Sequence, residues 1–285
     1  MEKVTLVECP RDAMQGIHDF IDTDLKIQYI NKLLKCNFDV LDFGSFVSPK
    51  AIPQMRDTAS VLEGLDLTNT KTKLLAIIAN ERGANDAIAF DQIHSLGFPL
   101  SISNTFQMRN TNASIEDAWK QVDAISTLCL KADKKLVVYL SMGFGNPYGD
   151  HWSPDILAEF SSRLIQDFDV ETIALSDTIG CANEALVRDV FSNLIPLTTG
   201  TEISAHLHVN PINATGIVEA AYEAGCRRFD GAIKGFGGCP MAKDDLTGNM
   251  PTEKMLEWFK SKEIPFSVNE DAFQEAYHFS STVFK

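Results

Sequence analysis

The stretch Ile203-Ser204-Ala205-His206-Leu207-His208 places two histidines one residue apart in a short, mostly apolar run. On an extended strand, residues two apart point to the same side, so both imidazoles face one surface. Neutral imidazole is the commonest metal ligand, and such a pair is one half of a metal site. The spacing is equally compatible with two histidines that simply pack inside a strand.

A metal at this pair needs oxygen partners from elsewhere in the sequence. Two candidates stand at opposite ends of the chain: Asp12 in Cys9-Pro10-Arg11-Asp12, and Asn249 in Thr247-Gly248-Asn249. A fold that closes its first strand beside its last ones would bring all four side chains together. The fold class therefore decides whether the site exists.

Short apolar runs alternate with longer amphipathic segments along the whole chain, which is the pattern of repeated βα units and a parallel sheet. The predicted strands are Val4 to Glu8, Val40 to Phe43, Leu74 to Ile78, Pro99 to Ser103, Leu136 to Ser141, Thr172 to Ser176, Glu202 to Leu207 and Arg228 to Ala232. The predicted helices are Asp24 to Cys36, Ser48 to Leu62, Glu81 to Leu96, Ser114 to Leu130, Ser153 to Phe168, Asn183 to Leu194, Ile212 to Ala224 and Thr252 to Lys262.

Eight strands with eight helices favour a closed (β/α)8 barrel over an open doubly wound sheet. Active-site residues of such a TIM barrel gather at the carboxyl ends of the strands. The segment from Val268 to Lys285 predicts one further helix on the outside. We therefore expect an α/β fold, a (β/α)8 TIM barrel with a C-terminal helical extension, with residues 1–285 forming a single domain.

Several helix ends carry their own signals. Ser114 and Ser153 precede acidic residues and predict capped helix starts, because their hydroxyls satisfy free backbone N–H groups. Gly97, Gly225 and Asn37 follow predicted helices where a left-handed residue is favoured.

Composition narrows the class of function. The 285 residues carry a formal charge of -14, which argues against a nucleic-acid partner, since phosphate backbones favour basic surfaces. The start of the chain lacks the features of a signal peptide, and no segment approaches the ~20 apolar residues of a membrane span. The six scattered cysteines suit reduced thiols. We expect a cytoplasmic protein that does not enter a membrane.

Charged residues follow the predicted strands at the end where a barrel has its active site. Arg11 and Asp12 follow the first strand, with Gln15 close behind. They form either a structural ion pair or a pairing of oxygen ligand and charge-stabilising cation. Asp42 ends the second strand and could act as a general base or orient one. Asp177 ends the sixth strand, where it could serve the site or cap the next helix.

Two further candidates lie in loops. Lys50 follows the second strand and could meet an anionic ligand, although a lysine at a helix start is usually solvated. After the eighth strand, the run Lys234-Gly235-Phe236-Gly237-Gly238-Cys239-Pro240-Met241 can fold close over a site, because glycines allow it. Cys239 lies between glycine and proline, where a thiol can transfer protons or attack if its pKa is lowered.

These motifs together resemble the hydroxymethylglutaryl-CoA lyase family, within the metal-dependent TIM-barrel lyases, from Val7 to about Ile264. The resemblance rests on Pro10-Arg11-Asp12 with Gln15, Ser45-Phe46-Val47-Ser48-Pro49-Lys50, Asp177-Thr178-Ile179-Gly180, His206-x-His208 and Gly235-Phe236-Gly237-Gly238-Cys239-Pro240 leading to Asn249. The glycine–cysteine loop is the most specific of them, since the related synthases carry a cysteine-free loop there.

The resemblance implies a divalent cation, magnesium or manganese, bound by Asp12, His206, His208 and Asn249. It implies that Arg11 holds a thioester carbonyl and stabilises an enolate, and that Cys239 is the catalytic thiol. His206 and Asp42, which stands where the family has glutamate, join the implied catalytic residues; Gln15, Lys50 and Asp177 join Arg11 in binding the acyl-CoA substrate. The implied reaction is a retro-Claisen cleavage of 3-hydroxy-3-methylglutaryl-CoA to acetoacetate and acetyl-CoA.

The sequence departs from the family pattern around the predicted ligands. Val209-Asn210-Pro211 replaces an aspartate and a glycine turn, and Gly145-Asn146-Pro147-Tyr148-Gly149 lacks the family's acid. Ala13 replaces a glycine, a mild change unless that position needs a positive φ. A sibling carbon-carbon lyase or aldolase, acting on a related hydroxyacyl thioester or hydroxy acid, is therefore a second hypothesis. A non-catalytic barrel that binds metal or metabolite is a third, and we expect a homodimer in each case.

Overall fold

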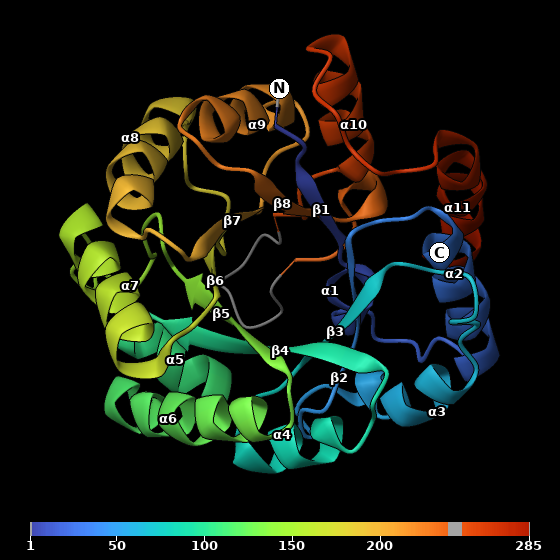
Figure 1. Ribbon diagram of the computed structural model, residues 1–285, viewed down its shortest axis with the longest axis horizontal. Helices are drawn as coiled ribbons and strands as arrows, with labels where there is room; N and C mark the ends of the chain where they lie inside the picture. The colour runs from blue at the N-terminus through green and yellow to red at the C-terminus, as the bar shows by residue number, and fades with distance from the viewer. Residues whose placement is uncertain (1, 239–246, 285) are drawn as a thin grey trace.

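The computed structural model describes residues 2–238 and 247–284, which form a closed barrel of eight parallel strands. Each strand pairs with the next in sequence order, and β1 closes the ring against β8 (Figure 1). The strands are β1 Thr5–Glu8, β2 Val40–Ser45, β3 Lys73–Ile77, β4 Ile93–Ser101, β5 Lys135–Ser141, β6 Thr172–Asp177, β7 Glu202–Leu207 and β8 Arg228–Gly231. The predicted (β/α)8 barrel is confirmed.

Helices surround the barrel on its outer face, except for the short α1, which lies at the carboxyl ends of the strands (Figure 1). They are α1 Pro10–Gln15, α2 Thr23–Lys35, α3 Thr58–Glu63, α4 Glu81–Ile88, α5 Asn104–Thr111, α6 Ile115–Lys131, α7 Pro154–Phe168, α8 Glu184–Leu194, α9 Ala214–Glu223, α10 Thr252–Ser261 and α11 Glu270–Val283. Short 3₁₀ turns add Pro53–Met55, Ile195–Leu197 and Ile233–Gly235. No helix in the described part of the chain is both long and apolar enough to cross a membrane.

The C-terminal helical extension is the predicted further helix, and α11 packs on α2. The ring of Phe279 on α11 lies 6.4 Å from that of Tyr29 on α2, centroid to centroid. The predicted caps also form: Ser114 and Ser153 accept hydrogen bonds from the backbone N–H groups of the first turns of α6 and α7. The extension is thus joined to α2 by apolar contacts, and the starts of α6 and α7 are fixed by local hydrogen bonds.

The prediction at β4 was wrong. The helix expected to run from Glu81 to Leu96 ends at Ile88, and residues from Ile93 onward form the strand. A short apolar run such as this one fits either element, so periodicity alone misplaced it. Gly97 is consequently a strand residue and not a helix cap; a Cβ there would come within 2.5 Å of the Ile77 side chain.

The helix predicted from Ser48 to Leu62 was also wrong in extent, because Pro53 begins a 3₁₀ turn and α3 begins only at Thr58. The short helices α1 and α5 were not predicted. Asn37 and Gly225 do take the expected positive φ, of 59° and 101°.

Strand β2 is longer than the predicted Val40 to Phe43 and has a register shift between Asp42 and Gly44 against β3. Asp42 is therefore inside the strand, with none of its surface exposed. An irregular strand near a site re-aims its side chains. The Asp42 carboxylate therefore lies within the barrel and not in a loop above it.

Candidate active site and metal centre

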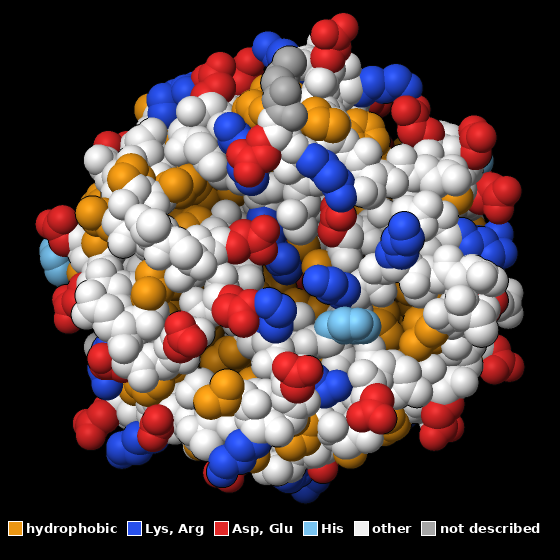
Figure 2. Space-filling view, viewed as in Figure 1, with side chains coloured by type: hydrophobic (Ala, Val, Ile, Leu, Met, Phe, Trp, Pro, Cys, Tyr) orange, Lys and Arg blue, Asp and Glu red, His pale blue; other side chains and the backbone are white. Residues whose placement is uncertain are grey.

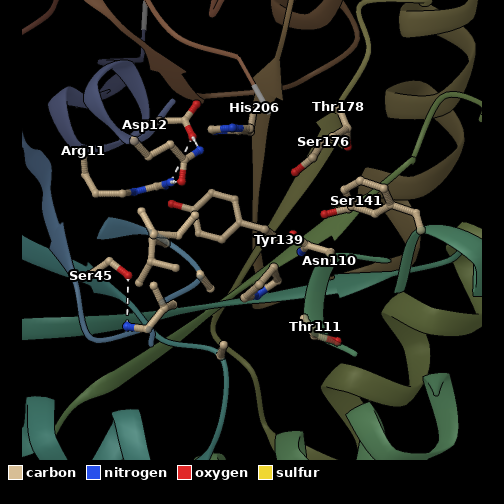
Figure 3. A pocket seen from close by; sticks show the side chains of 18 of the residues that line it. Arg11, Asp12, Ser45, Asn110, Thr111, Tyr139, Ser141, Ser176, Thr178 and His206 are labelled. Atoms are coloured by element: carbon tan, nitrogen blue, oxygen red, sulfur yellow. Dashed lines mark hydrogen bonds and ion pairs between the residues drawn. The ribbon is translucent and has the colours of Figure 1, made fainter. Parts of the chain in front are cut away.

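A cavity of about 260 Å³ opens at the carboxyl ends of the strands. Arg11 and Asp12 of α1, Tyr139 of β5 and His206 of β7 lie together at one end of it (Figure 3). Hydroxyl and amide side chains from other strand ends and from α5 line the rest, including Ser45, Asn110, Thr111, Ser141, Ser176 and Thr178. Small hydroxyl groups and a few charges thus face one open cavity.

The two histidines project from the end of β7 toward Asp12, as alternation along a strand requires. Their ring centroids are 5.6 Å apart, and His208 Nε2 lies 3.7 Å from Asp12 Oδ2. Donor atoms of Asp12, His206 and His208 all lie within 4.8 Å of one another. Asn249 forms a backbone bridge to His208 and is buried beside it. Donor atoms of three side chains from both ends of the chain therefore meet at one point, and Asn249 is buried beside them.

The polar atoms at this point fit a divalent cation. Asp12 Oδ2 is buried and has no hydrogen-bond partner. Although burial opposes its charge, Arg11 and the two histidines hold the pKa of Asp12 at about 2, so it is a carboxylate. Burial lowers the pKa of His208 to about 4, which leaves a neutral imidazole. Carboxylate and amide oxygens with two imidazole nitrogens suit magnesium or manganese.

Asp230 on β8 orients the second imidazole. Its Oδ2 lies 3.1 Å from His206 Nδ1, and its Oδ1 accepts a hydrogen bond of 2.8 Å from the Ser204 hydroxyl. Burial opposes a charge on His206, but the hydrogen bond and charge of Asp230 raise its pKa. Because Nδ1 is engaged, Nε2 is the nitrogen available to a cation, an arrangement typical of metal-binding histidines.

Arg11 is fixed by a second buried carboxylate. Its Nε donates to Asp42 Oδ1 and Oδ2 at 3.2 and 3.0 Å, and its Nη1 donates to Asp12 Oδ1 at 2.9 Å. Nη1 also donates to Gln15 Oε1, and Gln15 in turn donates to Asp12. Burial opposes the charge on Arg11, but both aspartates raise its pKa, so the guanidinium stays charged. Asp42 faces Arg11 and does not line the cavity.

Tyr139 is a site residue that the sequence analysis missed. Its hydroxyl is buried and has no hydrogen-bond partner, and its ring meets that of His206 edge-on at 5.1 Å (Figure 3). Burial raises the pKa of Tyr139 well above its usual value, so the hydroxyl remains a donor. Ser141 also lines the cavity from the same face of β5. That two-residue spacing at a predicted strand end was the available signal.

Two predicted substrate-binding residues lie away from the cavity lining. Both oxygens of Asp177 accept backbone hydrogen bonds, from Cys181 at 3.1 Å and Ala182 at 2.7 Å. Lys50 is exposed on the loop that follows β2. Cys239 lies outside the described residues. The roles of these three remain predictions.

The replacement of glycine by Ala13 is accommodated, since Ala13 is helical in α1 and has no positive φ. The fold and this site together define a class: a (β/α)8 barrel with a candidate divalent-cation centre at the carboxyl ends of its strands. Comparison with known proteins identifies the family within that class.

The family described as HMGL-like matches residues 3–279. The chain is 31% identical over 268 residues to a hydroxymethylglutaryl-CoA lyase of Bacillus subtilis, covering 94% of this chain and 88% of that protein. It is 29% identical to the human mitochondrial hydroxymethylglutaryl-CoA lyase, covering 98% of this chain and 85% of that one. The chain belongs to the HMGL-like family, and the predicted resemblance is confirmed.

Solved structures of HMG-CoA lyases have the same fold as this chain. A Bacillus subtilis HMG-CoA lyase superposes with a TM-score of 0.92 at 30% identity, covering 99% of this chain and 94% of that one. An HMG-CoA lyase from Acinetobacter baumannii, solved in complex with coenzyme A and 3-methylmalate, gives 0.91 at 28% identity, covering 99% and 91%.

Proposed function

We propose that this protein is a hydroxymethylglutaryl-CoA lyase. It cleaves 3-hydroxy-3-methylglutaryl-CoA to acetoacetate and acetyl-CoA, and the whole chain serves as one lyase domain. The observation that carries the proposal is the meeting of Asp12, His206 and His208 beside the fixed guanidinium of Arg11. The relatives named as lyases of this substrate, and the neighbour solved with coenzyme A, support the acyl-CoA class.

Asp12, His206, His208 and Asn249 would hold the cation, magnesium or manganese. A cation bound there supplies positive charge that favours loss of the proton from the substrate's tertiary hydroxyl. The unpartnered Asp12 Oδ2 and the two imidazoles supply the donor atoms.

The residues of the chain then account for the charge that develops. When the carbon-carbon bond breaks, its electron pair passes to the acetyl-CoA fragment as an enolate. Arg11 faces the cavity with its guanidinium held by Asp42, so it can donate to the thioester oxygen on which that charge gathers. Asp42 acts through Arg11 in this geometry. Tyr139 offers a second donor on the same side, and this one is neutral.

One proton must reach the methylene carbon of the enolate to give the acetyl methyl group. The resemblance assigns that transfer to Cys239. The hydroxyls of Ser141, Ser176 and Thr178 line the far side of the cavity and can bind the polar end of the acyl group. The negatively charged coenzyme A would extend toward the loops, where Lys50 is an exposed cation.

Product analysis tests the proposal. The purified protein is incubated with 3-hydroxy-3-methylglutaryl-CoA and Mg²⁺ or Mn²⁺, with and without a chelator. We expect acetoacetate and acetyl-CoA in equal amounts, and no product with the chelator. If the metal-loaded enzyme releases no acetoacetate, 3-hydroxy-3-methylglutaryl-CoA is ruled out as its substrate.

Two other outcomes would redirect the proposal. Metal-dependent turnover of a different hydroxyacyl thioester would assign the sibling lyase activity, for which the altered Gly145 to Gly149 segment leaves room. Metal binding in a calorimeter with no turnover of any acyl-CoA would assign a binding barrel. The homodimer and the cytoplasmic location remain predictions, the first to be checked by light scattering.

A further inference from the structure

Glu8, the last residue of β1, is a buried acid that the proposed chemistry does not use. None of its surface is exposed, and it lies four residues before Asp12. Its Oε1 accepts a hydrogen bond of 2.8 Å from the backbone N–H of Ile233, and its Oε2 accepts one of 2.6 Å from the Thr252 hydroxyl. One carboxyl group therefore joins two points that are nineteen positions apart in the sequence.

Those two points are the stems of the segment that leads from β8 to α10. We call residues 233–238 the outgoing limb and residues 247–252 the return limb. Near the stems the limbs are joined through Ala232, whose N–H donates to Met250 O at 3.0 Å and whose carbonyl accepts from Thr252 N–H at 3.2 Å. A Cβ on Gly248 would lie 2.2 Å from Gly235 O, so the limbs touch backbone to backbone.

The two limbs carry Asn249 into the candidate cation centre. Its Nδ2 donates to Phe236 O on the outgoing limb at 2.8 Å, and its backbone bridges to His208. A Cβ on Gly237 would lie 2.6 Å from Asp12 O and 2.9 Å from Asn249 Nδ2. The position of Asn249 relative to Asp12 thus depends on how both limbs sit on β1.

We propose that Glu8 is a positioning residue for the cation centre, clamping both limbs so that Asn249 meets Asp12 and the two imidazoles. It touches neither cation nor substrate. The inference rests on the proposed metal centre but not on the identity of the substrate. Its effect is on cation affinity, through the geometry of one oxygen ligand.

The chemistry around Glu8 favours this role over simple core filling. Glu8 forms no ion pair with any lysine or arginine in the described ranges, and a buried carboxyl without such a partner is costly where an apolar side chain is not. Burial, aided by Glu253, raises the pKa of Glu8 to about 8. The group is therefore mainly protonated at pH 7, and glutamine is its close mimic. What alanine removes and glutamine keeps is the pair of contacts to the limbs.

The test compares full-length variants with a matched control. Glu8→Ala removes both contacts and Thr252→Val removes one. Glu8→Gln keeps both, since its Oε1 can accept from the Ile233 N–H and its Nε2 can donate to the Thr252 hydroxyl oxygen. The control is Thr72→Val: this buried threonine donates a 2.7 Å hydrogen bond to Phe38 O, near the amino-terminal end of the barrel. The dissociation constant for Mn²⁺ is measured by calorimetry, and the free energy of unfolding by urea denaturation.

Loss of a residue that supports metal ligands weakens metal binding by about 10- to 100-fold. We expect that loss in Glu8→Ala, a smaller one in Thr252→Val, and wild-type affinity in Glu8→Gln and Thr72→Val. If Glu8→Ala does not fold, the test is the comparison of Thr252→Val with Thr72→Val. At similar stability, only Thr252→Val should bind Mn²⁺ more weakly. Wild-type affinity in a folded Glu8→Ala, or equal losses in the two valine variants, would overturn the clamp. Wild-type protein that binds Mn²⁺ but cleaves no substrate would overturn only the proposed function.

Discussion

The two ends of the barrel are both rich in charge, yet they use it differently. At the carboxyl end, Arg11, Asp12 and Asp42 are at most 6% exposed, and Asp12 Oδ2 has no partner. At the amino end, onto which Figure 2 looks, basic and acidic side chains gather around the centre of the barrel. Lys135 and Glu171 pair there with about half of each side chain exposed, whereas Arg228 is buried and pairs with the partly exposed Glu202.

This difference in burial separates charges that can bind a ligand from charges that are already solvated. Removing a charged group from water is costly, so a buried ion with an unused donor or acceptor marks a place where a ligand completes the bonding. An exposed pair already has water and its partner. We therefore expect substitutions at the two ends to have effects of very different size.

The largest contrast should come from two arginines, one at each end. Arg11→Lys keeps a positive charge but loses the forked contact with Asp42. The side-chain charge is then no longer aimed at the developing enolate. We expect kcat to fall by about 10²- to 10³-fold, the cost of losing one preorganised charge-stabilising donor. Steady-state release of acetyl-CoA measures it.

Arg228→Lys is the matched control at the amino end, where Arg228 Nη1 pairs with Glu202 at 3.0 Å. We expect its kcat to stay near that of the wild type. Equal losses of activity in the two variants would show that charge at either end serves catalysis, and the contrast would fail.

Buried acid at the carboxyl end should also make stability depend on pH. Burial, aided by Glu253, raises the pKa of Glu8 from 4.5 to about 8, so the folded protein keeps a proton that the unfolded chain releases. Stability from this group is full below pH 4.5 and is lost as pH rises through 8.

The comparison of wild type with Glu8→Gln isolates this effect. Between pH 5 and pH 8, the free energy of unfolding of the wild type should fall relative to that of the variant by a few kcal/mol, on the order given by a pKa shift of this size. Urea denaturation across that range measures it. Curves that run parallel would mean that Glu8 titrates normally in the folded state.

The fold and half of the site were readable from sequence because they rest on local patterns. Alternation predicted that His206 and His208 share a face, and barrel closure predicted that Asp12 and Asn249 join them. Tyr139 was missed because it lies in a mostly apolar strand, and Asp230 because its short strand already carries the charged Arg228 and forms no ligand motif. Their roles depend on which neighbour lies across the sheet, and no spacing along one strand encodes that.

The error at β4 has the same origin. Ile93 and Leu96 fit a helix that continues from Glu81, and only pairing with β3 and β5 selects the strand. Strand pairing is a tertiary interaction, so it can override a local pattern. Asp42 is a second example of a tertiary effect. It lies at the register shift in β2 and contacts Arg11.

Asp230→Asn tests whether a residue missed from sequence belongs with the functional charges. The amide keeps the size but loses the negative charge that holds His206 Nδ1–H, so the imidazole is freer to turn its other nitrogen away. We expect Mn²⁺ affinity to fall by about 10- to 100-fold with little change in fold. Calorimetry measures the affinity and circular dichroism checks the fold. Unchanged affinity would place Asp230 with the structural charges.

The smallest effect should come from Lys135→Ala at the amino end. Both Lys135 and Glu171 have 55% of the side chain exposed, so water replaces the lost partner and salt screens the pair. Such pairs contribute roughly 0–1 kcal/mol. We expect a change in the free energy of unfolding within that range, no change in kcat, and a coupling with Glu171→Ala that vanishes in high salt. A loss of activity in Lys135→Ala would contradict the comparison. An exposed charge with a partner would then affect catalysis, an effect that we assign only to buried charges with unused donors or acceptors.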